Sequence, residues 1–147
     1  MKSTSITISF LAILIIACQS ANNDDILVDL SQTINLPSDS LFQQLGEITE
    51  KVNHSGKYPC EKSDCMKFTF QDGKYEVITR NDMVEWLTIN KIPDYSGNEN
   101  ALQYLGLSNA NPDFINPGIV TRWENYNNIH EISFFPDYAL IIFSEPD

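Results

Sequence analysis

Apolar and polar residues alternate with different periods along the chain, and the first clear period is helical. Between Leu41 and Val52 apolar side chains recur every three or four residues, with polar residues between them. Ser40 and Gln43 open this run at the spacing of a capping box. The pattern predicts an amphipathic helix of about four turns that is closed by Gly56.

A β-hairpin is predicted next, around the dipeptide Asp72-Gly73. The runs 66–70 and 75–79 alternate between apolar and polar residues, and Asp-Gly is favoured where both turn residues need a positive φ. One register places the large apolar side chains on one face, with Phe70 opposite Tyr75, Phe68 opposite Val77 and Met66 opposite Thr79.

The second half of the chain is predicted to hold two short helices followed by three strands. The helices are expected from Asp82 to Asn90 and from Ala101 to Gly106. The strands are expected at 119–124, 129–135 and 138–143, and the last is apolar on both faces, as an internal strand would be. No internal repeat is visible. The sequence therefore predicts one α+β domain with a mostly antiparallel sheet of about five strands, one amphipathic N-terminal helix and two short helices.

Composition supports a single globular domain and narrows the class of partner. The chain has 147 residues, of which 42% are hydrophobic. Nine Lys and Arg against 20 Asp and Glu give a formal net charge of -11, so a phosphate-neutralising surface is missing and nucleic acid is excluded. The acidity suits a solubilising surface, and it also suits steering of a basic protein partner.

Residues 1–17 have the pattern of a secretory signal peptide. Lys2 precedes an apolar run from Ile6 to Ala17, and a polar segment follows at once. The run is shorter than the roughly 20 residues that a membrane-spanning helix needs. The run therefore predicts that the protein is exported and that this segment does not span the membrane.

This segment ends in Ile15-Ile16-Ala17-Cys18, which resembles the lipobox of bacterial lipoproteins. The resemblance covers the N-terminus alone, and it implies that Cys18 receives diacylglycerol and becomes the first residue of the mature chain. Gln19 after the cysteine implies sorting to the outer membrane. The alternative is an ordinary signal peptide that leaves Cys18 free. The expected division is a signal peptide at 1–17, a lipidated polar tether at 18–37 and a globular domain at 38–147.

Lipidation of Cys18 would leave Cys60 and Cys65 as an even pair in an exported protein, which predicts a disulfide. Because the loop between them is short, chain entropy assigns the bond about 2 kcal/mol. Zinc is the alternative, but a zinc site would need further ligands from His54 and His130. No cofactor or metal is predicted.

Catalytic motifs for nucleophilic hydrolysis, zinc proteolysis or nucleotide binding are missing from the sequence. Glu124, Glu131 and Asp137 belong to the predicted C-terminal strands and their turns, where they could converge with His130 as acid and base. His130 also alternates in phase with Ile132, which suits a packed sheet histidine. A small envelope hydrolase is thus one alternative function.

Two long connections, 91–100 and 108–118, are left unexplained by packing, and loops on a rigid scaffold are where binding residues gather. We predict a lipid-anchored binding module of the cell envelope rather than an enzyme. An inhibitor or immunity protein against a basic toxin or lysozyme is a second alternative. The candidate binding residues are Asp94, Glu99, Asp113, Trp123 and Tyr126.

Overall fold

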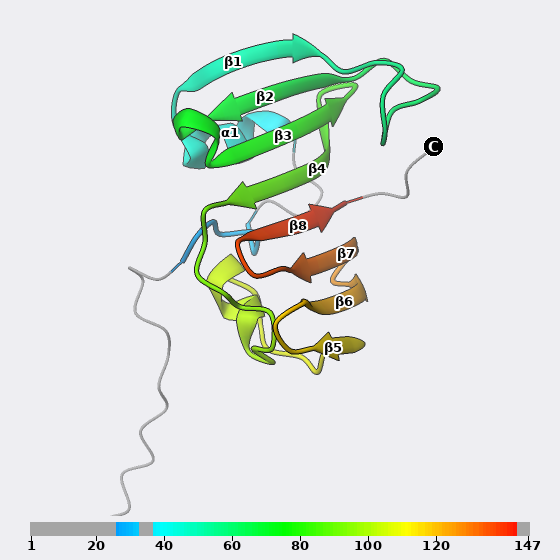
Figure 1. Cartoon of the computed structure of the whole chain (residues 1–147). Coiled ribbons are helices and arrows are strands. Elements are labelled where there is room, and N and C mark those ends of the chain that lie inside the picture. The colour runs from blue at the N-terminus through cyan, green and yellow to red at the C-terminus, as the bar shows by residue number, and fades with distance from the viewer. Residues whose placement is uncertain (1–25, 33–36, 144–147) are drawn as a thin grey trace, which may run out of the picture.

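A computed structural model describes residues 26–32 and 37–143. In these ranges the chain forms one eight-stranded antiparallel sheet, one α-helix and two short 3-10 helices (Figure 1). The predicted signal peptide, Cys18 and most of the predicted tether lie outside the described residues. The elements are α1 (Ser38–Leu45), β1 (Ile48–Asn53), β2 (Met66–Phe70), η2 (Gln71–Gly73), β3 (Tyr75–Arg80), β4 (Met83–Asn90), η3 (Ala101–Leu105), β5 (Phe114–Asn116), β6 (Val120–Tyr126), β7 (Ile129–Phe134) and β8 (Tyr138–Ile142).

The strands follow the order β1-β2-β3-β4-β8-β7-β6-β5, so the sheet consists of two four-stranded meanders. A helix precedes each meander, α1 before β1 and η3 before β5. The two halves meet where β4 pairs with β8, the last strand of each half. Apart from η2, the two halves therefore have the same order of one helix and four strands, although the sequence shows no repeat.

The predicted α+β fold with about five strands is wrong, because the described chain is mostly β. Part of the error lies in the first predicted helix, which ends at Leu45 rather than continuing to Val52. Gly46 has a φ of 87°, a conformation that glycine adopts without steric cost, and it closes the helix. Ile48 and Val52 are β-branched and enter the edge strand β1.

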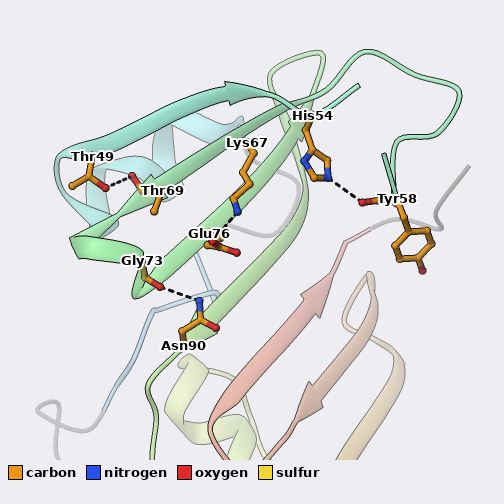
Figure 2. Close-up of polar contacts among 8 residues, drawn as sticks. All are labelled: Thr49, His54, Tyr58, Lys67, Thr69, Gly73, Glu76 and Asn90. Atoms are coloured by element: carbon orange, nitrogen blue, oxygen red, sulfur yellow. Dashed lines mark hydrogen bonds and ion pairs between the residues drawn. The ribbon is translucent and has the colours of Figure 1, made fainter. Parts of the chain in front are cut away.

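The second predicted helix, from Asp82 to Asn90, is the strand β4. Asn81 and Asp82 do not cap a helix but form a two-residue turn in which both have a positive φ, as hairpin turns require. The alternating pattern of β4 was obscured because Trp86 on one face and Leu87 on the other are both large and apolar. The side chain of Asn90 donates to the Gly73 carbonyl at 2.9 Å and ties the end of β4 to the turn between β2 and β3 (Figure 2).

Several local predictions are confirmed. The first hairpin has the expected register, with Phe70 opposite Tyr75. The last three strands lie where they were expected, and β8 is internal, between β4 and β7. The 108–118 connection differs, because it contains the short edge strand β5.

One face of the sheet carries the core and is covered by α1, η3 and residues 26–32. Leu41 and Leu45 of α1 and Leu102 and Leu105 of η3 are buried against it in one cluster. Figure 1 shows α1 lying against the first half of the sheet. No helix in the described ranges is long and apolar enough to cross a membrane.

Residues 26–32, which belong to the predicted tether, are part of this covering layer. Val28 and Leu30 are buried in the core. The backbone N–H groups of Leu27 and Leu30 donate to two carbonyls of η3, those of Tyr104 and Leu105, at 2.8 and 2.9 Å. The packed domain therefore begins before residue 38.

The opposite face, which we call the open face, is not covered by a helix in the described part of the chain. The strand register places one row of its side chains across the sheet from β2 to β6. The row consists of Lys67, Ile78, Trp86, Ile142, Glu131 and Glu124. The β1–β2 connection packs over this row, where its two cysteines lie against Ile78 and Trp86.

Candidate binding site

A pocket of about 170 Å³ lies on the open face in the first half of the sheet. Strands β2, β3 and β4 form its floor, and the β1–β2 connection, residues 54–65, forms its wall. Apolar and polar side chains both contribute to it, which is typical of a ligand pocket. The lining residues are His54, Tyr58, Pro59, Lys67, Glu76, Ile78, Trp86 and Thr88.

The wall is a closed and internally bonded loop. A disulfide joins Cys60 to Cys65, both of which are 2% exposed, so the predicted pairing is confirmed. The two cysteines and Ile78 form a small buried cluster against which Trp86 packs. The disulfide thus fixes the loop on the sheet more than it stabilises the whole fold, because its short loop is worth only about 2 kcal/mol.

His54 holds the aromatic part of this loop in place. Its Nε2 donates to the backbone carbonyl of Tyr58 at 2.9 Å (Figure 2). Its own backbone N–H donates to the carbonyl of Cys65, also at 2.9 Å. His54 therefore links both sides of the loop and is a positioning residue for Tyr58.

Two aromatic rings from different elements meet at the pocket. Tyr58 comes from the loop and is 60% exposed, whereas Trp86 comes from β4 and is half-buried. Their ring centroids are 5.5 Å apart and their planes are nearly perpendicular, at 86°. This edge-to-face contact is a favourable geometry for two rings, and it leaves ring surface available to a ligand.

The polar part of the pocket is an ion pair between neighbouring strands. Lys67 Nζ lies 2.8 Å from Glu76 Oε1, and both side chains are partly exposed (Figure 2). Thr88 lies beside Glu76 in the register of β3 and β4. The ammonium, the second carboxylate oxygen and the hydroxyl together offer hydrogen-bond donors and acceptors to a ligand.

The second half of the sheet carries an equivalent ion pair without a pocket wall. Arg122 of β6 and Glu131 of β7 lie 3.3 Å apart, at the strand positions that Lys67 and Glu76 occupy in β2 and β3. The β5–β6 connection, however, is only the turn 117–119. The 54–65 loop is therefore the feature that distinguishes the first half as a candidate site.

The candidate binding residues from the sequence lie elsewhere, and most of them serve the fold. The side-chain hydroxyl and then the backbone N–H of Ser96 hold the pKa of Asp94 below its ordinary value, because both donate to its carboxylate. Asp113 accepts the backbone N–H of Glu124 at 2.8 Å. Glu99 is exposed in the 91–100 loop.

The two aromatic candidates belong to the other face. Trp123 is 1% exposed, and its indole N–H donates to the carbonyl of Ala110 at 2.9 Å. Tyr126 is half-buried, and its hydroxyl donates to the carbonyl of Ser108 at 2.7 Å. Trp123 is thus a core residue, and the two rings hold residues 108–110 of the connection against the sheet.

The carboxylates of the hydrolase alternative come together only in part. Glu124 and Glu131 are directly opposite each other on the open face. Alternation along β7 turns His130 toward the other face, away from Glu131. Asp137 lies in the turn before β8, where its backbone carbonyl accepts the N–H of Ile92.

The pocket residues Tyr58, Lys67, Glu76 and Trp86 were not among the sequence candidates. A local signal existed for the loop, because Tyr58-Pro59 directly precedes the first of two closely spaced cysteines. Trp86 could have been found only by recognising β4 as a strand. Its place beside the 54–65 loop depends on pairing between distant segments.

Among the described residues, no group of three or more His, Cys, Asp and Glu side chains is placed to hold a metal ion. No family model, curated protein or solved structure matches this chain.

Proposed function

We propose that the protein is a binding module of the bacterial cell envelope, that a lipid anchor holds it at the outer membrane, and that it binds through the pocket at Tyr58 and Trp86. The observation that carries the proposal is this pocket itself. It combines an exposed ring, a half-buried ring and an ion pair under a loop that is closed by a disulfide. Recognition sites commonly consist of such an amphipathic pocket on a rigid scaffold.

A lipid anchor suits this arrangement, because a tethered domain searches only the surface to which it is attached. The lipobox-like segment before Cys18 supports the anchor, and a disulfide suits an exported protein. Two or three acyl chains would be enough for stable attachment.

Photo-cross-linking in cells tests where the module binds. Benzophenone-alanine placed at Tyr58 should capture the partner, and the same group placed at Phe114 should not. The two positions are a matched pair, because both are exposed aromatics, 60% and 50%, and Phe114 lies on the edge strand of the other half. Capture at Phe114 alone would move the site to the second half. If the captured partner is a basic protein, and if its capture declines as the salt concentration rises, the result favours the inhibitor alternative instead.

Replacement of Cys18 tests the anchor. The native chain should begin at Cys18, carry the mass of two or three acyl chains and stay with the membrane fraction. Cys18→Ser should release the protein into the soluble fraction, because a serine cannot form the thioether to diacylglycerol. Intact mass spectrometry and fractionation measure both results, with Ser20→Ala as the matched control. An unmodified N-terminus would contradict the lipoprotein assignment.

A further inference from the structure

We infer that the pocket at Tyr58 and Trp86 binds a neutral saccharide. This inference rests on the proposed function and adds the chemical class of the ligand. It is drawn from the size of the pocket, its charge, its hydrogen-bonding groups and its aromatic surface.

The size of the pocket favours a single ring rather than a cofactor. Its volume is about 170 Å³, below the roughly 300–1,000 Å³ of pockets that enclose drug-sized ligands. It is partly open to solvent, and Tyr58 in its wall is itself exposed. One pyranose ring fits this space, and the rest of an oligosaccharide can continue outside it.

The charge of the pocket favours a neutral ligand. Lys67 and Glu76 compensate each other at 2.8 Å, so the lining carries no formal net charge when His54 is neutral. A cationic ligand would meet the Lys67 ammonium, and an anionic ligand would meet both Glu76 and the field of a chain with a net charge of -11. The two charged side chains of the lining pair with each other, so neither is left to pair with a cationic or an anionic ligand.

The same ion pair suits neighbouring hydroxyl groups. One oxygen of Glu76 accepts from Lys67, which leaves its other oxygen and the remaining ammonium protons for a ligand. A vicinal diol can donate one hydroxyl to the carboxylate and accept from the ammonium with the other. Such charge-assisted bonds are stronger than those between neutral groups.

The aromatic rings suit the apolar face of a sugar. A pyranose ring has hydroxyls at its rim and C–H groups on its faces, so it can stack on one ring and meet the other with its edge. Tyr58 and Trp86 offer two nearly perpendicular surfaces from the loop and the sheet. The disulfide and the His54 hydrogen bond hold Tyr58 close to Trp86, which limits the ordering cost of binding.

Titration of the full chain, purified in a detergent without a sugar headgroup, tests the inference. The probes are neutral trisaccharides of glucose and of N-acetylglucosamine, with a trisaccharide of galacturonic acid as the anionic comparison. Tryptophan fluorescence should change saturably with at least one neutral probe and stay constant with the anionic one. Trp86 is the reporter, because the other tryptophan, Trp123, is 1% exposed.

Two glutamates provide a matched pair of variants. Glu76→Gln should weaken binding of the neutral probe by about tenfold, because it removes a charge-assisted hydrogen bond. Glu131→Gln removes the equivalent carboxylate in the half without the loop, and it should bind as the wild type does. Both variants keep Trp86 as the reporter, and both ion pairs are partly exposed, so little stability is lost. Calorimetry on Trp86→Ala, which lacks the reporter, should detect no binding.

The outcomes separate this inference from the proposed function. If no neutral saccharide binds while a partner is still captured at Tyr58 in cells, the saccharide assignment is overturned and the binding module stands. If no neutral saccharide binds and no partner is captured at Tyr58, the saccharide assignment and the binding module are both overturned. Equal weakening by Glu76→Gln and Glu131→Gln would place the saccharide outside the pocket.

Discussion

A chain that begins at residue 38 is expected to be largely unfolded under conditions in which the full chain is folded. The truncation removes residues 26–32, and with them Val28 and Leu30, which are 4% and 0% exposed in the core. Burial of one such side chain contributes about 1.5–3 kcal/mol. The hydrogen bond from Tyr75 Oη to the Leu27 carbonyl, at 2.8 Å, is lost as well. Together these losses are comparable to the free energy of unfolding of a typical domain, which is roughly 5–15 kcal/mol.

Urea unfolding followed by circular dichroism measures this effect. A chain that begins at residue 26 is the matched control, because it keeps the packed segment and lacks the same predicted signal peptide. Leu30→Ala in the full chain should cost about 2–5 kcal/mol, whereas Gln32→Ala, at an exposed position, should cost little. Equal unfolding midpoints for the chains from 26 and from 38 would show that the segment adds nothing to the fold.

The parts of the fold that were predictable depend on signals within a few residues. Asp72-Gly73 between alternating runs specified the first hairpin and its register. The last three strands were equally visible, since polar turns separate short apolar runs rich in aromatic and β-branched residues. These signals are local, and so they could be used without knowing the rest of the chain.

The errors in the predicted fold arose where the apolar residues fit both the helical period and the strand period. Residues 83–90 carry apolar side chains on both faces of a strand, so a helical spacing could be selected from them. Leu45 and Ile48 are likewise at helical spacing, although Gly46 lies between them and closes the helix. In both places the sheet decides the outcome, because strand pairing satisfies backbone groups that the sequence pattern does not describe.

The candidate site was less predictable than the fold. Its residues come from the 54–65 loop and from β2, β3 and β4, and none of them carries a known motif. The acidic residues that the sequence favoured are mostly engaged in loop structure, as the bonds of Asp94 to Ser96 illustrate. The two halves of the sheet share an ion pair at equivalent strand positions, and only a comparison of the halves in three dimensions shows that the loop is what differs.

Gly106→Ala is expected to destabilise the protein by about 2–5 kcal/mol, because two separate costs meet at this position. Gly106 ends η3 with a φ of 67°, and a left-handed conformation costs a residue with a Cβ about 1–2 kcal/mol. A Cβ there would also contact the Asp29 carboxylate and lie 3.3 Å from the Asp29 Cα, and such overpacking costs about 1–3 kcal/mol.

Gly118→Ala separates the two costs, because Gly118 has a φ of 77° and an added Cβ would have no neighbour within 4 Å. It should lose only the conformational part, about 1–2 kcal/mol. The double variant Gly106→Ala with Asp29→Ala should be more stable than the sum of the single losses predicts, since removal of the carboxylate makes room for the methyl group. Urea midpoints of the wild type, of the three single variants Gly106→Ala, Asp29→Ala and Gly118→Ala, and of the double variant provide the measurement. If Gly106→Ala and Gly118→Ala cost the same, residues 26–32 do not press on η3 as closely as the contact with Asp29 requires.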